Sequence, residues 1–168
     1  MRFDLFPFKP QIIEARWILR ILPSEEVPQI AQKALELGYD GKNIARIAGL
    51  NHPTNADLLS LFSGFLAELG ANSIQSQNQA GWVLAEAIAQ GICDGWVEPY
   101  DGARFIWREI VNRLWPNQQH RLLSFVGNAS KYEDCESYSD QPERTRREIA
   151  KEIIKDAREL LAERTQRV

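Results

Sequence analysis

The chain has 168 residues, 44% of them hydrophobic and 26% charged, with a formal net charge of -3. This is the composition of an ordinary globular protein, and it excludes collagen-like and intrinsically disordered chains. A chain of this length can bury roughly 70% of the surface that its unfolded form exposes, so it needs no disulfide or metal to fold. We therefore expect one domain over residues 1–168, with its own hydrophobic core.

The cysteines and the apolar segments bear on where the protein works. Cys93 and Cys135 are isolated in the sequence, which is typical of reduced thiols in a cytoplasmic protein rather than of a disulfide framework. The first residues, MRFDLFPFKPQ, lack the long apolar stretch of a secretory signal. No apolar run approaches the roughly 20 residues that a membrane span needs. We expect a cytoplasmic protein that does not enter a membrane.

Apolar residues in the first forty positions recur at intervals of three and four, the spacing that lines one face of a helix. This pattern predicts a helix over residues 11–22, stopped by Pro23. Ser24 is placed to cap the next helix, because its hydroxyl can accept a hydrogen bond from a free amide of the first turn. Gly38 is expected to end that second helix.

The next two segments predict a helical hairpin. A short helix is expected over residues 40–49, and Thr54 and Asp57 have the spacing of a capping box that opens a helix ended by Gly70. The pair loosely resembles a helix-turn-helix motif. However, the second helix offers no basic residue to contact phosphate, which argues against nucleic-acid binding.

The second half of the chain predicts more helices. One is expected over residues 74–91, with Gly91 and Gly95 ending it and turning the chain, and Pro99 is placed to begin the next, with Glu98 as its cap and Asp101 in its first turn. A short helix over 118–130, an acidic loop over 132–143 and a charged final helix over 142–165 follow. The chain as a whole predicts an all-α fold of about seven or eight helices with orthogonal or bundle-like packing.

Charge is distributed unevenly along the chain. From Ile47 to Ala103 there is no Lys or Arg, whereas the segment contains six carboxylates, Asp57, Glu68, Glu86, Asp94, Glu98 and Asp101. Two interpretations remain open. These helices could be core elements covered by the more basic terminal helices, or they could present an acidic face to a cationic partner.

Tyrosines and a tryptophan beside carboxylates mark two candidate binding patches, because aromatic side chains flanked by charge are common where proteins contact each other. The first patch comprises Tyr132, Glu133, Asp134, Glu136 and Tyr138, and the second comprises Trp96, Glu98, Tyr100 and Asp101.

The sequence predicts no catalytic residue, metal site or cofactor site. His52 and His120 are far apart and belong to no zinc-binding pattern. Cys93 has no histidine base marked out for it, and neither a nucleophile elbow nor a phosphate-binding loop occurs. These observations favour a binding protein over an enzyme.

Three functions stay open. The first is a small cytoplasmic module that binds a basic protein partner by surface complementarity, as an immunity protein, an antitoxin or a regulator does. The second is a small-ligand-binding protein or enzyme with an interhelical pocket lined by Trp82, Trp96 and Trp107. The third is a helix-turn-helix regulator, which would need a basic stripe built from the terminal helices.

Overall fold

The structure is a computed structural model that describes residues 6–71 and 73–165. Within these ranges every regular element is helical and no strand occurs, so the all-α prediction is confirmed. The contacts divide the chain into two compact units, residues 1–80 and 81–168, and the boundary falls inside helix α5. The single domain over residues 1–168 stays a prediction.

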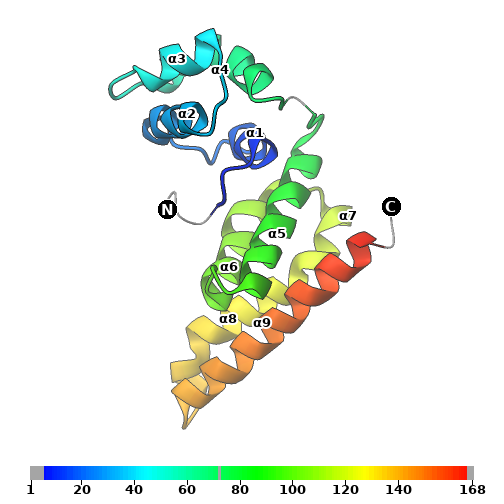
Figure 1. Ribbon diagram of the computed structural model, residues 1–168. Helices are drawn as coiled ribbons and strands as arrows, with labels where there is room; N and C mark the ends of the chain where they lie inside the picture. Colours follow the sequence, from blue (N-terminus) through cyan, green and yellow to red (C-terminus); the bar gives the residue numbers. More distant parts are fainter. Residues whose placement is uncertain (1–5, 72, 166–168) are drawn as a thin grey trace. The chain divides into compact units, whose positions relative to one another are not determined.

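The element order of the first unit is α1 (Pro10–Ile18), the short 3-10 helix η2 (Ser24–Glu26), α2 (Val27–Glu36), α3 (Lys42–Ala48) and α4 (Asn55–Glu68) (Figure 1). The helix α5 (Gln77–Asp94) leads into the second unit. That unit continues with α6 (Pro99–Phe105), a π-helical turn η3 (Ile106–Ile110), the 3-10 turn η4 (Val111–Arg113), α7 (Pro116–Gln119), the 3-10 turn η5 (His120–Leu122), α8 (Leu123–Tyr138) and α9 (Pro142–Thr165).

The core of the first unit is built around aromatic side chains of α1 and α4. The rings of Trp17 and Phe62 stack with centroids 3.8 Å apart, and Phe65 lies 5.3 Å from Phe62 in a tilted arrangement. Aliphatic side chains of α2 and α3, such as Ile30 and Ile44, complete this buried cluster. Such a core explains why apolar residues recur at helical spacing in this part of the sequence.

Local capping signals position the helix pair α3–α4 as the sequence predicts. The hydroxyl of Thr54 accepts a hydrogen bond from the amide of Asp57 at 3.3 Å, and the Asp57 carboxylate accepts from the amide of Thr54 at 2.8 Å. Gly38 and Gly70 end α2 and α4 with φ of +86° and +73°, conformations that favour glycine. The capping box and both helix ends are confirmed.

The prediction for Ser24 is wrong. Ser24 begins the 3-10 turn η2, and α2 begins three residues later with Glu26 at its N-cap and no side-chain hydrogen bond. Pro28 in the first turn of α2 lacks an amide hydrogen, so one of the free donors that a capping serine would satisfy is absent. The amide of Val27 donates to the Ser24 carbonyl, so the turn η2 runs directly into α2.

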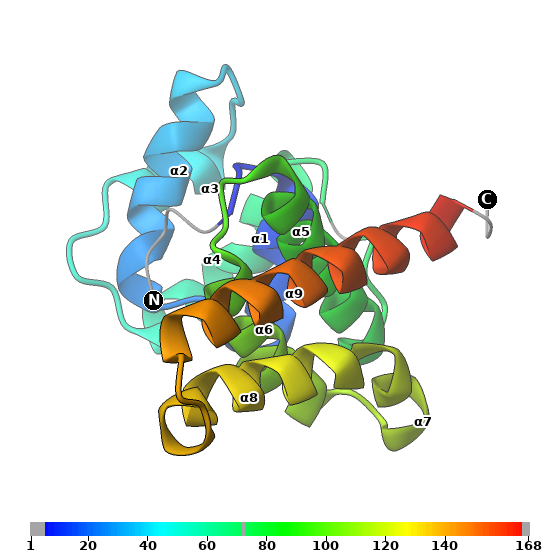
Figure 2. The ribbon, with the colours of Figure 1, turned by 90° about the horizontal axis from the view of Figure 1, so that it is seen from below.

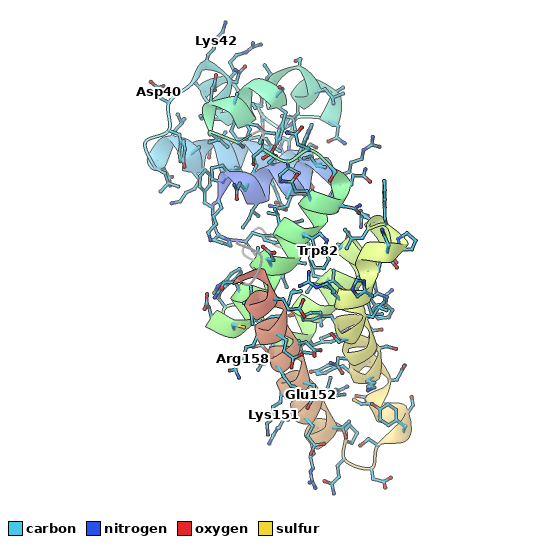
Figure 3. The ribbon with its side chains drawn as sticks, turned by 90° about the vertical axis from the view of Figure 1, so that its right-hand side faces the viewer. Asp40, Lys42, Trp82, Lys151, Glu152 and Arg158 are labelled. Carbon is cyan, nitrogen blue, oxygen red and sulfur yellow. The ribbon has the colours of Figure 1, made fainter. Side chains whose placement is uncertain are left out.

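In the second unit, α8 and α9 lie side by side and run in opposite directions (Figures 1 and 2). Phe125 and Ala129 of α8 and Ile153 and Ala157 of α9 are all buried. The opposite side of α9 is charged and exposed, as Figure 3 shows for its three labelled residues, Lys151, Glu152 and Arg158. This arrangement confirms an amphipathic final helix.

The predicted acidic loop over residues 132–143 is wrong in its first half, because α8 continues to Tyr138. The sequence contains the reason. The apolar stripe of Phe125 and Ala129 continues through Tyr132, which is half-buried, and Cys135, which is fully buried. Cys135 and Tyr132 therefore extend the helix by two turns beyond the predicted end at residue 130.

Two glycines were expected to end α5. Gly95, with φ +79°, follows the helix directly as predicted, whereas Gly91 lies inside it, because the helix continues to Asp94. Gly91 instead permits close packing. A Cβ atom added there would lie 2.6 Å from a methyl group of Val97 and 2.7 Å from the ring of Trp96. The predicted start of α6 is confirmed, with Pro99 in the first turn and Glu98 at the N-cap, although the Glu98 side chain makes no capping hydrogen bond.

Candidate functional site

The two candidate patches meet in the second unit. The ring of Tyr100, in the first turn of α6, stacks on the ring of Tyr132 of α8, with centroids 4.2 Å apart and planes 12° from parallel. The Tyr100 hydroxyl donates a hydrogen bond to Glu133 at 3.0 Å. Residues 33 positions apart in the sequence thus form one aromatic and acidic cluster, which the sequence predicts only as two separate segments.

Arginines that the sequence analysis did not single out surround this cluster. The Glu133 carboxylate lies 3.3 Å from the guanidinium of Arg108 and 3.7 Å from that of Arg104. Arg108 also lies over the ring of Trp107, 4.3 Å from its centroid. Glu133 is therefore neutralised within the chain rather than presented as a free negative charge.

Electrostatics at Tyr100 follow from this geometry. Burial raises the pKa of the Tyr100 phenol, and the hydrogen bond to Glu133 and the negative charge of that carboxylate raise it further. The positive charge of Arg104 lowers the pKa of Tyr100, but the effects that raise it are larger. The phenol is accordingly a hydrogen-bond donor at neutral pH, which keeps the ring fixed against Tyr132.

Arg146 of α9 closes the other side of the cluster. Its guanidinium donates to Glu136 at 2.8 Å and to Glu143 at 3.0 Å, and it lies 5.4 Å from the ring centroid of Tyr132. The two carboxylates raise the pKa of Arg146 further above its already high value. Glu136, like Glu133, is therefore paired internally.

We call this surface the tyrosine–arginine face. It is made by Tyr100, Arg104, Arg108, Tyr132, Glu133, Glu136 and Arg146. Its middle is carried in part by η3, the π-helical turn that contains Arg108. Turns of π-helix occur frequently at functional sites. Gln119 donates to the carbonyl oxygens of Val111 and Leu114, both at 3.0 Å, so the irregular helix end is held by side chains.

The other predicted patch residues keep side chains available to solvent. Trp96 packs one edge on Gly91 and is 41% exposed. Tyr138 is 57% exposed, with its hydroxyl donating to a backbone carbonyl of the same helix. Among the described residues, Glu98, Asp101 and Asp134 have no ion-pair partner. These three carboxylates are the acids of the patches whose charge is not compensated by a neighbouring cation.

Several acids of the segment without Lys or Arg have structural partners. Glu68 accepts hydrogen bonds from the amides of Asn43 and Ile44, at 2.9 and 2.8 Å, and so caps the N-terminus of α3. Asp57 belongs to the capping box, and Asp94 accepts from Gln90 at 2.8 Å. Hydrogen bonds donated by amides, rather than ion pairs with the terminal helices, account for these three carboxylates.

The tryptophans expected to line a shared pocket have separate environments. Trp82 lies under the guanidinium of Arg121, at 4.8 Å, and Trp107 lies under Arg108. Trp96 packs on Gly91. Two described pockets with aromatic side chains in their walls are in the first unit instead, one beside Trp17 and one beside Phe6 and Phe8.

The residues weighed for chemistry lie in ordinary surroundings. His52 occupies an exposed turn with φ +48°, and a ring nitrogen of His120 lies 3.2 Å from the carbonyl oxygen of Asn117. Burial raises the pKa of the Cys93 thiol, which disfavours the reactive thiolate. Within residues 6–71 and 73–165, no three His, Cys, Asp or Glu side chains form a group that could hold a metal ion. None of the described helices is long and apolar enough to cross a membrane.

No protein-family model, curated protein or solved structure matches this chain. The functional argument therefore depends on the geometry of its own residues.

Proposed function

We propose that this chain is a small cytoplasmic protein-binding module that uses the tyrosine–arginine face to bind a basic protein partner, in the manner of an immunity protein, an antitoxin or a regulator. The observation that carries the proposal is the stacking of Tyr100 on Tyr132, which joins the two candidate patches into one surface. The two free cysteines support the proposed compartment, because reduced thiols are usual in the cytoplasm.

The composition of the face supports protein binding. Tyr, Trp and Arg are the residues that contribute most often to binding energy at protein interfaces. Two tyrosines and three arginines make up most of this face, and Trp107 lies against Arg108 at its edge. The rings and guanidinium groups are already fixed by stacking and ion pairs. Little conformational entropy would therefore be lost when a partner binds.

The unpaired carboxylates support a basic partner. Asp101 and Asp134 belong to α6 and α8, the same helices that provide Tyr100 and Tyr132, and both are exposed. Exposed carboxylates without an ion-pair partner raise the rate of association with a positively charged partner, and this effect weakens as the salt concentration increases. The internally paired Glu133 and Glu136 would contribute shape and fixed geometry rather than net charge.

The test begins with capture of partners by the tagged protein from native lysate at low and moderate salt. Each candidate partner is then compared between Asp101→Asn/Asp134→Asn and a control, Glu25→Gln/Asp40→Asn, which changes the net charge equally in the other unit. Asp40 lies in the exposed segment before α3 (Figure 3). We expect salt-sensitive capture that the first double variant weakens and the control retains.

A photo-crosslinking side chain locates the contact. It replaces Tyr138 in one variant and Leu37 in the other, two exposed positions in different units. Crosslinks to the partner from position 138 and none from position 37 are expected. Capture that is equal in both double variants, or crosslinks from position 37 alone, would contradict the proposal.

A further inference from the structure

The first unit contains a pocket that the proposed function does not use. Its volume is about 620 Å³, which is within the range of small-molecule sites in proteins. The walls come from the end of α1, the residues that follow it and the start of α4. They are formed by Trp17, Ile18, Arg20, Leu22, Asn55 and Leu59.

Most of the lining is apolar, and part of it is unusually exposed. Leu59 is 69% exposed, although it belongs to the helix that also provides the buried Phe62. Trp17 stacks on Phe62 on the core side and is only partly buried. An apolar wall open to water can gain free energy by taking up an apolar ligand.

Both polar residues of the lining are exposed, and neither has a side-chain partner in the part of the chain that the structure describes. Neither the Arg20 guanidinium nor the Asn55 amide has a hydrogen bond or ion pair with another side chain or carbonyl in residues 6–71 and 73–165. A few polar groups without partners in an apolar pocket are the usual means by which a site orients its ligand. The charged group in this pocket is the guanidinium of Arg20, which is a cation.

The backbone of Arg20 provides an independent observation. Arg20 has φ +55° and closes α1, with its amide donating to the Trp17 carbonyl at 2.9 Å and the next amide donating to Arg16 at 3.0 Å. Helices α2, α4 and α5 place a glycine at the equivalent position, Gly38, Gly70 and Gly95. A non-glycine residue in this conformation costs on the order of 1 kcal/mol. Turn formation alone would favour glycine at position 20.

From these observations we infer that the pocket beside Trp17 binds a small amphipathic anion, namely a carboxylate with an aromatic or branched apolar body. The apolar body would lie against Trp17, Ile18, Leu22 and Leu59, and the carboxylate would pair with Arg20 and accept from Asn55. The inference is independent of the proposed protein interface, because the two sites belong to different units.

The test titrates three naphthalene probes of nearly equal size into the full chain: naphthylacetate, naphthylethanol and naphthylmethylammonium. Binding is followed by the NMR shifts of backbone amides and of the five tryptophan indoles. We expect saturable shifts at Trp17, Ile18 and Leu59, with the anion bound most tightly and the cation least. Equal affinity for all three probes, or no saturable shift at millimolar concentration, would overturn the inference.

Variants separate the role of Arg20 in binding from any structural role. Arg20→Gly should bind naphthylacetate about tenfold more weakly, while its melting temperature stays the same or rises, because glycine suits φ +55°. Arg20→Lys should retain most of the preference for the anion. Leu59→Gln should weaken all three probes without unfolding the protein, because Leu59 is exposed. Unchanged affinity in Arg20→Gly would show that Arg20 is not the anion-binding group and would refute the inference.

Discussion

Replacing Glu68 by alanine tests how the helix pair α3–α4 is held together. The Glu68 carboxylate accepts hydrogen bonds from two amides of the first turn of α3, at 2.9 and 2.8 Å, and from the side-chain amide of Asn43 at 2.7 Å. Gly41 fits this arrangement, because a Cβ atom there would lie only 2.2 Å from the carboxylate. An acceptor 25 residues away thus performs the role that an N-cap residue normally has.

The expected magnitude follows from three effects. Loss of a capping acceptor costs about 1 kcal/mol, and a second unsatisfied amide costs about 1 kcal/mol more. In the other direction, a carboxylate in the last turn of α4 interacts unfavourably with the helix dipole, so its removal gains roughly 0.5 kcal/mol. The net expectation for Glu68→Ala is a decrease of about 1.5 kcal/mol in the free energy of unfolding.

The assay is urea unfolding, with hydrogen exchange of the Asn43 and Ile44 amides measured in parallel. The control is Glu36→Ala, which removes an exposed carboxylate from the last residue of α2. This change breaks only a surface ion pair with Lys33. If Glu68→Ala and the control agreed within about 0.5 kcal/mol, and the two amides kept their protection, the result would falsify the capping role.

Acid should remove the effect of Glu68. Burial acts to raise the pKa of Glu68, but the hydrogen bonds from Asn43 and Ile44 outweigh it, so the pKa lies below its ordinary value of 4.5. A carboxylate with a depressed pKa stabilises the folded state above its ordinary pKa, and this contribution is lost as the pH falls through the folded value. The difference between wild type and Glu68→Gln should therefore be largest at neutral pH and disappear in strong acid.

Three other substitutions or treatments give further predictions. Gly91→Ala should lower the free energy of unfolding by about 1–2 kcal/mol in the same urea assay, because the added methyl group would lie 2.6 Å from the Val97 side chain. Gly127→Ala, whose added methyl group would have no atom within 4 Å, should instead raise the free energy of unfolding slightly. Cys93 and Cys135 should react slowly with a thiol reagent in the folded protein and quickly in urea, because Cys135 is buried and Cys93 is partly buried with a raised pKa. Rapid reaction of Cys135 in the folded protein would contradict its burial. Burial raises the pKa of Asp156, so its ionised form destabilises the folded state. Asp156→Asn should therefore raise the free energy of unfolding at neutral pH, and this gain should vanish in acid, where Asp156 is protonated. A gain that does not change with pH would contradict this.

Features that depend on near neighbours in the sequence could be predicted from it. The capping box of Thr54 and Asp57 and the glycine ends at Gly38 and Gly70 are satisfied within a few residues, and all are confirmed. Pro99 likewise begins α6 as predicted, because a proline there sacrifices no helical hydrogen bond. Most helices were predicted for the same reason.

Features that depend on distant residues could not be predicted. Glu68 accepts a hydrogen bond from the amide of Ile44, 24 residues away, and Glu133 accepts one from Arg108, 25 residues away, and no local pattern identifies these partners. The π-helical turn at Ile106–Ile110 also has no local signature of its own. By contrast, the extension of α8 was available in the sequence, since Cys135 continues the apolar stripe that includes Phe125. The many acidic residues around it obscured the pattern.

The internal pairing of Glu133 changes how a basic partner would be recognised. A partner cation that approached Glu133 would compete with two arginines and with the Tyr100 hydroxyl, which already satisfy that carboxylate. Breaking such a network leaves charges without partners, which is costly when they are partly buried. A basic partner should therefore contact the uncompensated Asp101 and Asp134, while the stacked tyrosines provide apolar contact area. For this reason charge changes at Asp101 and Asp134 should affect the association rate, whereas a change at Glu133 should first affect the folded face itself.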